Sequence, residues 1–388
     1  MRPTLGTLVN EQSLPREPSE CFECDFNAVG GQVSRISTPA RRLGFYHTTI
    51  RSGGHMSGYH VYAIGNAIVD KEFEVSDALF REESITKGQM TLVEAAEQQT
   101  LIDKLKSRYG LKKRASGGSA ANTVMATQCF GGKTFLSCKV AADEPGDFYA
   151  HDLAAAGIHS NLKVERETGT TGRCVVMVSP DAERTMHTCL GIAGGISEME
   201  LIPDLIELSE YFYIEGYLVT SDSARAAAIK AKSIAEKSGK KVAITFSDPS
   251  MVEHFKDGLG EIIGEGVDLL FCNEEEALLW AGCDSLEGAV EALKKTAKQF
   301  VVTKGAEGAL LYDGENTINI APYSAKAVDT NGAGDMFAGA FLYGITHNFD
   351  VEKAGKLASY ASSITVSTFG PRLEPEQYQL VLQDFLAI

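Results

Sequence analysis

From Tyr59 onward, short apolar segments alternate with longer amphipathic ones, and this alternation constrains the fold more than any other feature. Short apolar segments predict strands, and segments with a helical spacing of apolar residues predict helices. The predicted strands are 61–68, 134–140, 211–214, 242–246, 267–272, 300–303 and 310–312; the predicted helices are 92–109, 120–130, 223–238, a segment from 274, 334–345 and 351–366. The alternation predicts a three-layer α/β/α domain with a mostly parallel central sheet.

One stretch departs from this alternation. Residues 170–178 and 184–190 are strand-like, and Pro180-Asp181-Ala182-Glu183 between them is a turn sequence. Such a pattern predicts a β-hairpin. We expect the hairpin, within about 168–190, and strand material after Asp70 to form a small β lid on a main domain that covers 59–388.

Residues 1–58 differ from the rest of the chain. They are rich in Pro, Arg, Ser and Gly and show no periodicity, which predicts a poorly ordered extension. Gly54-His55-Met56 is compatible with an added tag, with a start at Met56 or with a natural tail. Cys21 and Cys24 form a lone Cys-x-x-Cys, whose spacing alone does not favour a zinc or redox site. The other six cysteines lie mostly in apolar segments, which favours reduced thiols and a cytoplasmic location.

The charge balance limits the partners. A net charge of −16 argues against general binding to nucleic acids or anionic membranes. No apolar run approaches the roughly 18 residues that indicate a membrane span. We therefore expect a small-molecule ligand and a monomer or homodimer. Binding of an anionic phosphate would need backbone N–H groups, a few basic residues and a metal ion.

The segment Asp329-Thr330-Asn331-Gly332-Ala333-Gly334-Asp335 precedes a predicted helix. Small residues let successive N–H groups turn towards a phosphate, and the helix N-terminus adds the positive end of its dipole. Asp335 falls in the first helical turn, where a carboxylate can accept the proton of an attacking hydroxyl. Taken alone, a glycine loop before a capped helix also explains such a string.

Three shorter motifs contain residues suited to ligand binding, and the second and third of them follow predicted strands. Gly117-Gly118-Ser119-Ala120-Ala121-Asn122 allows close approach of a ligand to the backbone and offers an amide to sugar hydroxyls. Asn273-Glu274-Glu275-Glu276 is either an N-capped helix start or a site for a hydrated Mg²⁺. Thr303-Lys304-Gly305 alone is an ordinary turn. No Walker A string, G-x-x-x-x-G-K-[ST], occurs in the sequence.

In this order, the motifs resemble those of the ribokinase (PfkB) family of carbohydrate and nucleoside kinases, from about Tyr59 to Leu373. The resemblance implies a ribokinase-like fold and a phosphotransferase that uses ATP and Mg²⁺, with Asp335 as general base. It also implies the following roles: anion binding by Gly332, Ala333 and Gly334; substrate binding by Gly117, Gly118, Ser119 and Asn122; nucleotide binding by Asn273, Thr303, Gly305, Gly308 and Thr330; Mg²⁺ contact through water by Glu276; and binding of a monovalent cation such as K⁺ by Asp329, Asn331 and Gly370.

The first strand points to a branch of that family. Gly65-Asn66-Ala67-Ile68-Val69-Asp70 resembles the adenosine-kinase branch, which implies that Asn66 and Asp70 bind the substrate and that Asp70 holds a ribose diol. Gln89, Arg184 and Tyr217 also fall at substrate-pocket positions of that branch. Ser250 stands where the branch has an aromatic residue, so a free sugar such as ribose or fructose remains an alternative acceptor. A non-catalytic nucleotide- or sugar-binding protein is the alternative of another class.

Overall fold

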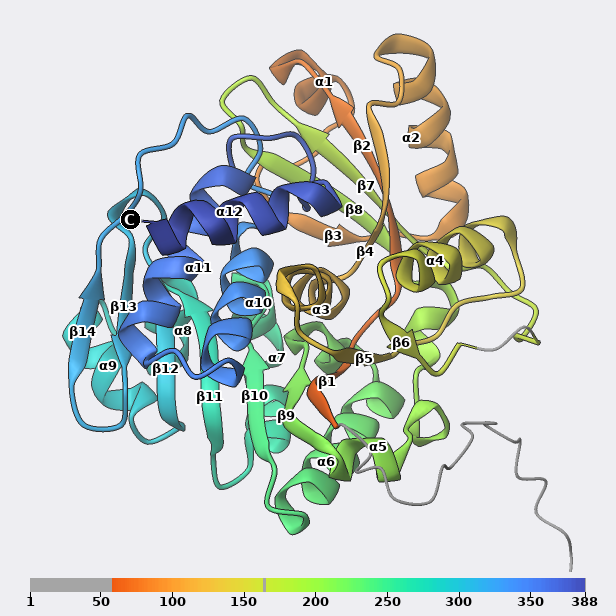
Figure 1. The fold of residues 1–388 in the computed structure, drawn as a ribbon. Coiled ribbons are helices and arrows are strands. Elements are labelled where there is room, and N and C mark those ends of the chain that lie inside the picture. Colours follow the sequence, from red (N-terminus) through yellow and green to blue (C-terminus); the bar gives the residue numbers. More distant parts are fainter. Residues whose placement is uncertain (1–57, 163–164, 388) are drawn as a thin grey trace, which may run out of the picture. The chain divides into compact units, whose positions relative to one another are not determined.

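The computed structural model describes residues 58–162 and 165–387, which form two β-sheets and their covering helices (Figure 1). The predicted extension, with Cys21 and Cys24, lies outside these residues except for Gly58. Within the described ranges, no helix is long and apolar enough to cross a membrane. The six cysteines in these ranges are free thiols.

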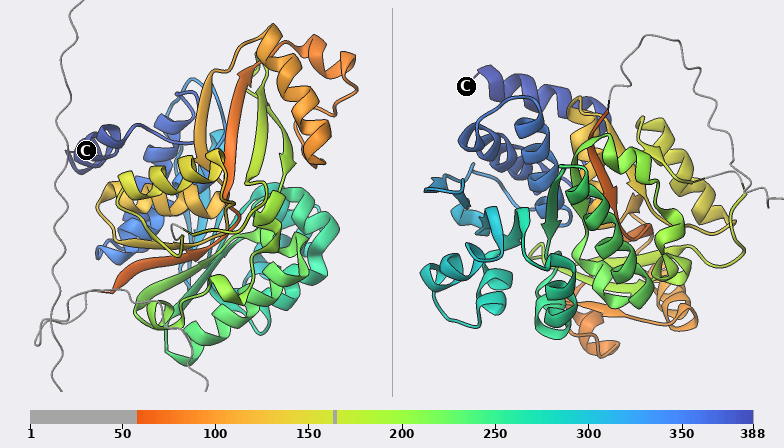
Figure 2. Two further views of the ribbon diagram at one scale, coloured as in Figure 1. Left: turned by 90° about the vertical axis from the view of Figure 1, so that its right-hand side faces the viewer. Right: turned by 90° about the horizontal axis from the view of Figure 1, so that it is seen from below.

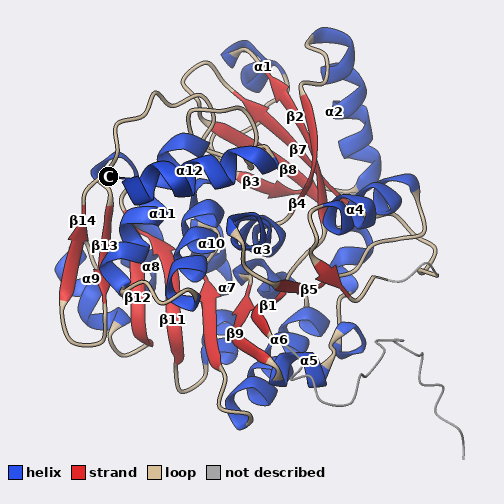
Figure 3. Cartoon of the chain, viewed as in Figure 1, coloured by secondary structure: helices blue, strands red, loops and turns tan. Residues whose placement is uncertain are grey.

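The larger sheet has the strand order β14-β13-β12-β11-β10-β9-β1-β5-β6 (Figure 3). Its strands run parallel from β6 to β12, while β13 is antiparallel to both of its neighbours. The bounds are β1 (Tyr59–Ile64), β5 (Thr134–Ser137), β6 (His159–Ser160), β9 (Ser209–Ile214), β10 (Lys241–Thr245), β11 (Val267–Asn273), β12 (Ala297–Thr303), β13 (Ala309–Tyr312) and β14 (Thr317–Ile320). The predicted mostly parallel sheet is confirmed.

Helices cover both faces of this sheet, because its buried strands are apolar on both sides (Figure 2). In β1, Val61 and Ala63 pack into one core, and Tyr62 and Ile64 into the other. The first core includes α3 (Ser119–Phe130), α4 (Glu144–Ala155), α10 (Ala333–Thr346), α11 (Val351–Thr365) and α12 (Pro375–Ala387). The second includes α5 (Pro203–Glu207), α6 (Asp222–Lys237), α7 (Pro249–Ile263), α8 (Glu274–Ala281) and α9 (Leu286–Leu293).

The smaller sheet has the order β3-β8-β7-β2-β4 and corresponds to the predicted lid. Its strands are β2 (Ile68–Glu74), β3 (Met90–Leu92), β4 (Lys113–Gly117), β7 (Gly172–Val178) and β8 (Arg184–Cys189). The antiparallel pair β7–β8 is the predicted hairpin. Helices α1 (Asp77–Glu82) and α2 (Ala95–Arg108) cover one face through a separate apolar cluster, which leaves the other face turned towards the carboxyl ends of the large sheet.

Two predicted elements run into strands of the smaller sheet. The apolar run 61–68 is not one strand, because β1 ends at Ile64 and β2 begins at Ile68 in the other sheet. The pairing stops where the N–H of Asn66 donates to a side chain, Glu215, rather than to a neighbouring strand. The helix predicted from 92 begins at Ala95, because Met90–Leu92 pairs with β8 as an edge strand.

Candidate active site

A cavity of about 240 Å³ lies between the carboxyl ends of the large sheet and the inner face of the lid. Open α/β sheets bind ligands at this end of their strands. The predicted site residues that line it are Asn66, Asp70, Gly118, Ser119, Asn122, Arg184, Tyr217, Asn273, Glu276, Thr303, Thr330, Asn331, Gly332, Ala333, Gly334 and Asp335. The fold therefore gathers residues from seven separate segments of the chain into one place.

Asp335 lies in the first turn of α10, and two side chains of α3 hold its carboxylate. The Ser119 hydroxyl donates to Oδ1 at 2.6 Å, and the Asn122 amide donates to Oδ2 at 2.9 Å. Residues three apart share one face of a helix, so both donors reach the same carboxylate. The helices touch directly, since the Thr127 hydroxyl donates to the Gly339 carbonyl at 2.9 Å. Each carboxylate oxygen keeps a lone pair for a ligand in the cavity.

The surroundings of Asp335 change its acidity. Desolvation raises the pKa of Asp335, and the hydrogen bonds from Ser119 and Asn122 oppose this rise. The positive charges of Arg184 and Arg372 also lower the pKa of the Asp335 carboxyl, but desolvation prevails. A carboxylate with a raised pKa is a better proton acceptor, which suits general-base chemistry.

The N-terminus of α10 forms an anion-binding arrangement beside Asp335. Gly332 is the N-cap residue with φ of +72°, and a side chain there would collide with the carbonyl oxygen of Pro371. Only glycine fits both requirements. The first N–H groups of a helix have no partner within it, and they carry the positive end of the helix dipole. Gly332, Ala333 and Gly334 line the cavity wall, and the Ala333 N–H donates to the Thr330 carbonyl at 3.3 Å.

Asp70 and the start of α3 form another part of the cavity wall. Asp70 is 6% exposed, and none of the described residues donates a hydrogen bond to its carboxylate. Burial raises the pKa of Asp70 to about 7, although the charges of Arg372 and Arg184 oppose the rise. Gly118 has φ of +97°, and a side chain there would collide with the backbone oxygen of Asn66. The glycine therefore allows the Asn66 turn and α3 to meet beside Asp70.

Glu215, which follows β9, is a cavity residue that the sequence reasoning missed. It is fully buried and accepts three hydrogen bonds: from the Asn66 backbone and side chain at 3.1 Å each, and from the Ala120 N–H at 2.9 Å. Burial raises its pKa to about 7. The carboxylate thus joins the turn after β1 to the N-terminus of α3. The sequence signal that could have identified Glu215 is its place as an acidic residue directly after a buried strand.

Asn273 and Glu276 form a capping box at the start of α8. The Glu276 N–H donates to Asn273 Oδ1 at 2.8 Å, and the Asn273 N–H and amide donate to the two Glu276 oxygens at 3.0 Å each. Burial raises the pKa of Glu276 to about 8. Among the residues that the structure describes, no group of three or more His, Cys, Asp or Glu side chains has the geometry to hold a metal. Contact of Glu276 with Mg²⁺ through water stays a prediction.

Comparison with known proteins identifies the family. The model of the pfkB family carbohydrate kinases matches residues 93–377. The chain belongs to this pfkB family and is a kinase. The predicted resemblance is thereby confirmed.

Individual relatives agree with this assignment. Adenosine kinase of Saccharomyces cerevisiae is 27% identical over 336 residues, which cover 81% of this chain and 96% of the yeast protein. The structure of a probable sugar kinase from Rhizobium etli CFN 42 matches with a TM-score of 0.80 and 32% identity over 85% of this chain and all of that chain. Adenosine kinase from Sinorhizobium meliloti matches with a TM-score of 0.78 and 33% identity over 84% of this chain and 99% of that one. The ribokinase-like fold and the likeness to the adenosine-kinase branch are confirmed.

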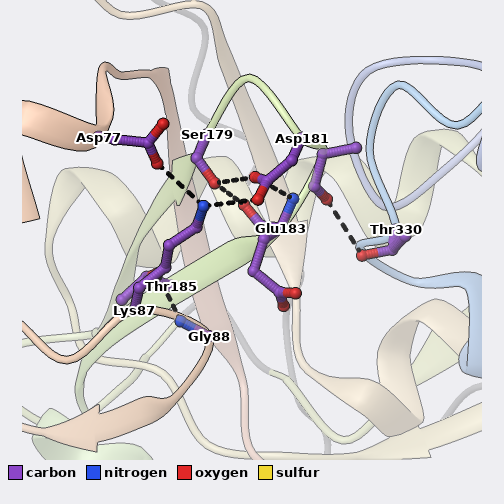
Figure 4. Close-up of polar contacts among 9 residues, drawn as sticks. Asp77, Lys87, Gly88, Ser179, Asp181, Glu183, Thr185 and Thr330 are labelled. Carbon is purple, nitrogen blue, oxygen red and sulfur yellow. Dashed lines mark hydrogen bonds and ion pairs between the residues drawn. The ribbon is translucent and has the colours of Figure 1, made fainter.

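In this pfkB kinase, the tip of the β7–β8 hairpin contacts the anion loop, residues 329–335. The Thr330 hydroxyl donates to the Ala182 carbonyl at 3.5 Å (Figure 4). The Arg184 guanidinium donates to Asn331 Oδ1 at 2.9 Å. The ammonium of Lys87 bridges the hairpin tip to α1, since it contacts Asp181 at 2.7 Å and Asp77 at 2.9 Å. The lid and the anion loop are therefore linked through two consecutive loop residues.

Several predicted residues lie outside the cavity lining. Gln89 is exposed, and its carbonyl accepts the Met186 N–H at 3.0 Å, so that Met90 and Leu92 face the cavity instead. Asp329 is fully buried and accepts the N–H groups of Asn331 at 2.8 Å and Gly370 at 2.9 Å. Asp329 and Gly370 thus support the anion loop from behind. The remaining predicted residues that do not line the cavity are Gly117, which lies against the Asp70 carboxylate, and Gly305 and Gly308 after β12.

Proposed function

We propose that this pfkB kinase transfers the γ-phosphoryl group of ATP to a hydroxyl group of a nucleoside, with Asp335 as the general base. The observation that carries the proposal is the Asp335 carboxylate itself. Ser119 and Asn122 hold it at the cavity wall, in the same first turn as the backbone N–H groups at the start of α10, Gly332 to Gly334. A proton acceptor beside an anion site is the arrangement that phosphoryl transfer to a hydroxyl needs.

The residues have separate roles in the reaction. The acceptor hydroxyl donates to Asp335, which takes its proton as the oxygen attacks phosphorus. The N–H groups at the start of α10 stabilise the negative charge on the transferred group. Arg184 adds a positive charge from the lid, and its contact with Asn331 links closure of the lid to the anion loop. A closed lid excludes water, which would otherwise compete as the acceptor.

The site is compatible with the cofactors expected of such an enzyme. Bound to the ATP phosphates, Mg²⁺ neutralises their charge, and Glu276 at the cavity wall would hold one of its water molecules. Asn273, Thr303 and Thr330 would contact the nucleotide. A monovalent cation would find oxygen ligands behind the anion loop, where Asp329 and Asn331 lie near the buried and unpartnered Oε2 of Glu72. These are the ligand atoms that hard cations prefer.

A nucleoside fits the remainder of the cavity. The Asp70 carboxylate can accept two vicinal hydroxyl groups, as in the 2′,3′-diol of ribose. The lid adds an apolar cover, from Met90, Leu92 and Met186, which suits the faces of a base. Tyr217 lines the same cavity with its hydroxyl held by Asp248 at 3.4 Å, and its ring can stack on a base.

A free sugar is the second candidate acceptor, and one observation favours it. Ser250 lies in the first turn of α7, where its N–H and hydroxyl donate to the N-cap residue Asp248 at 2.9 Å and 2.5 Å. It is not among the cavity-lining residues. The chain therefore has no aromatic wall for a base at this position, and a free sugar would need none.

A substrate screen tests the proposal. ADP release is measured with Mg²⁺ and ATP in the presence of purine and pyrimidine nucleosides, ribose, fructose and related sugars. We expect release that depends on a nucleoside and yields a phosphorylated product by mass spectrometry. The rate without an acceptor serves as the control. If a sugar has the highest kcat/KM, the sugar-kinase alternative replaces the nucleoside assignment; ADP release with no acceptor dependence contradicts both.

A further inference from the structure

Arg372 is a buried cation that contacts the residue behind the catalytic carboxylate. It lies in the loop between α11 and α12 and is 8% exposed. Its Nε donates to Asn122 Oδ1 at 2.8 Å. One terminal nitrogen donates to the Ser116 hydroxyl at 2.8 Å and to the Asp152 carboxylate at 3.1 Å. The only side chain between Arg372 and Asp335 in this series of hydrogen bonds is therefore Asn122.

The chemistry of the guanidinium fixes the orientation of the Asn122 amide. A guanidinium has donors and no acceptor, so the amide atom that faces Arg372 must be the oxygen. The NH₂ group must then point the other way, where it donates to Asp335 Oδ2 at 2.9 Å. An asparagine whose orientation is set by its hydrogen-bond network has one favourable state here. A flipped amide would place its oxygen against the Asp335 carboxylate and its NH₂ against Arg372.

We infer that Arg372 is a positioning residue for the general base: it locks the Asn122 amide so that the amide donates to Asp335. The inference rests on the proposed role of Asp335. With both donors in place, Ser119 on Oδ1 and Asn122 on Oδ2 fix the plane of the carboxylate and aim its free lone pairs into the cavity. Without Arg372, the amide is free to rotate, and Oδ2 loses its donor for part of the time.

The loop that carries Arg372 is itself tied to the anion site. The N–H of Gly370 donates to Asp329 at 2.9 Å, and the carbonyl of Pro371 packs against Gly332. Asp152 anchors the guanidinium from α4, and the Ser116 hydroxyl also donates to Asp152. One short segment, 370–372, thus supports both the N-terminus of α10 and the donor to the base. This placement favours a functional role over a merely structural ion pair.

The charges around Asp335 give a second, measurable consequence. The groups that face it are Arg184 from β8, Asp70 from β2, Glu215 after β9 and Arg372, besides Ser119 and Asn122 of α3. Arg372 lowers the pKa of Asp335 and of Asp70. Its removal therefore raises both pKa values and moves the acidic limb of the pH–kcat profile to higher pH.

The test is a double-mutant cycle on kcat with Arg372→Met, Asn122→Ala and the double variant. We expect Arg372→Met to lower kcat by roughly ten- to a hundredfold, the effect of losing a hydrogen bond to a charged group, while the KM for ATP stays unchanged. In the Asn122→Ala background the same change should alter kcat by no more than about twofold at a pH above the acidic limb of both variants, because the residue through which Arg372 positions Asp335 is gone. Arg372→Lys, which keeps the charge and one donor, should recover part of kcat.

Two controls separate this role from a loss of folding. Arg225→Met removes a comparable guanidinium that pairs with Asp222 and Glu261 on the surface, and it should leave kcat and the pH profile unchanged. Thermal unfolding of each variant shows whether it is folded at the assay temperature. Should Arg372→Met lower kcat equally in both backgrounds, or leave kcat and the acidic limb unchanged, the inference is wrong. If Asp335→Asn is active, the proposed base fails instead, whatever Arg372 does.

Discussion

Replacement of Asp335 by Asn should remove catalysis and leave the site intact. Because Arg372 fixes the Asn122 amide as a donor, the oxygen of the new amide must face Asn122. Its NH₂ group then faces Ser119, whose hydroxyl can rotate from donor to acceptor. Both contacts of the wild-type carboxylate, at 2.6 Å and 2.9 Å, are thus preserved in the variant. The substitution therefore removes the group that accepts the proton and alters little else in the site.

The expected magnitude follows from this isosteric fit. Loss of a general base typically costs about 10²- to 10⁴-fold in rate, and here no packing defect should add to that loss. The assay is steady-state ADP release with the best acceptor from the substrate screen. Calorimetric titration with a non-hydrolysable ATP analogue should give a Kd within about twofold of wild type, since Asp335 lies on the acceptor side of the anion loop. Ser119→Ala, which removes a donor and keeps the base, is the matched variant and should lose less activity.

Stability supplies an independent check on the same variant. Desolvation raises the pKa of Asp335 above the value of the unfolded chain, so the folded state prefers the protonated carboxyl. Ionisation at neutral pH therefore destabilises the wild type, and the uncharged amide avoids this cost. The variant should unfold at the same temperature as wild type or higher. A variant that keeps more than about half of the wild-type kcat, where base removal predicts at least ~10²-fold loss, refutes the assignment.

Three further predictions concern the rest of the cavity. Wild type should prefer a ribonucleoside over its 2′-deoxy analogue by roughly ten- to a hundredfold in kcat/KM. Asp70→Ala should abolish this preference along with most activity. Equal rates with both substrates in wild type would rule out the contact between Asp70 and the ribose diol. Burial raises the pKa of Glu72 from 4.5 to about 8, so its stabilising effect is complete below pH 4.5 and is lost as the pH rises towards 8. The free energy of unfolding measured in urea should fall between pH 5 and 8.5 in wild type but not in Glu72→Gln. The same pH dependence in both proteins would disprove this effect of Glu72. Activity should be higher in K⁺ than in N-methylglucamine. Lys113→Met should enlarge this difference, because it removes an ammonium that donates to the Phe369 and Arg372 carbonyls at 3.4 Å and 3.5 Å. Equal rates in all cations would argue against the monovalent cation site.

The sequence predicts the layers of this fold well and its crossovers poorly. Buried parallel strands and the α6 helix have composition and spacing that reveal them directly, and Pro180-Asp181 marks the hairpin. The run 61–68 is apolar except at Gly65 and Asn66, because β1 and the start of β2 are both buried, although they belong to different sheets. Gly65-Asn66 is a local turn signal, but it does not show that the chain passes to another sheet. The break depends on Glu215, which lies 149 positions further along the chain.

The same limit applies to the candidate site. Residues within recognisable motifs, such as Ser119, Asn122 and Asp335, were predicted, and the fold brings them into contact although they are more than 200 positions apart in sequence. Arg372 stands in no motif, and it reaches Asn122 across 250 positions. Its buried contacts are set by the packing of α12 and the preceding loop, which pattern alone does not determine. Supporting residues are thus harder to predict than the groups they support.

The distribution of charge in the cavity explains how an acidic protein can bind an anionic donor. In the proposed reaction, the acceptor hydroxyl groups donate to the Asp70 carboxylate, whose pKa is raised to about 7, whereas Glu215 accepts N–H groups of Asn66 and Ala120. The proposed phosphate donor would face the backbone N–H groups at the N-terminus of α10, which attract an anion without a charged side chain. Arg184 is attached to the lid and contacts Asn331 of the anion loop at 2.9 Å. In the proposed reaction, positive charge at the phosphate would therefore depend on the position of the hairpin, and a closed lid would both exclude water and complete the electrostatic environment of transfer.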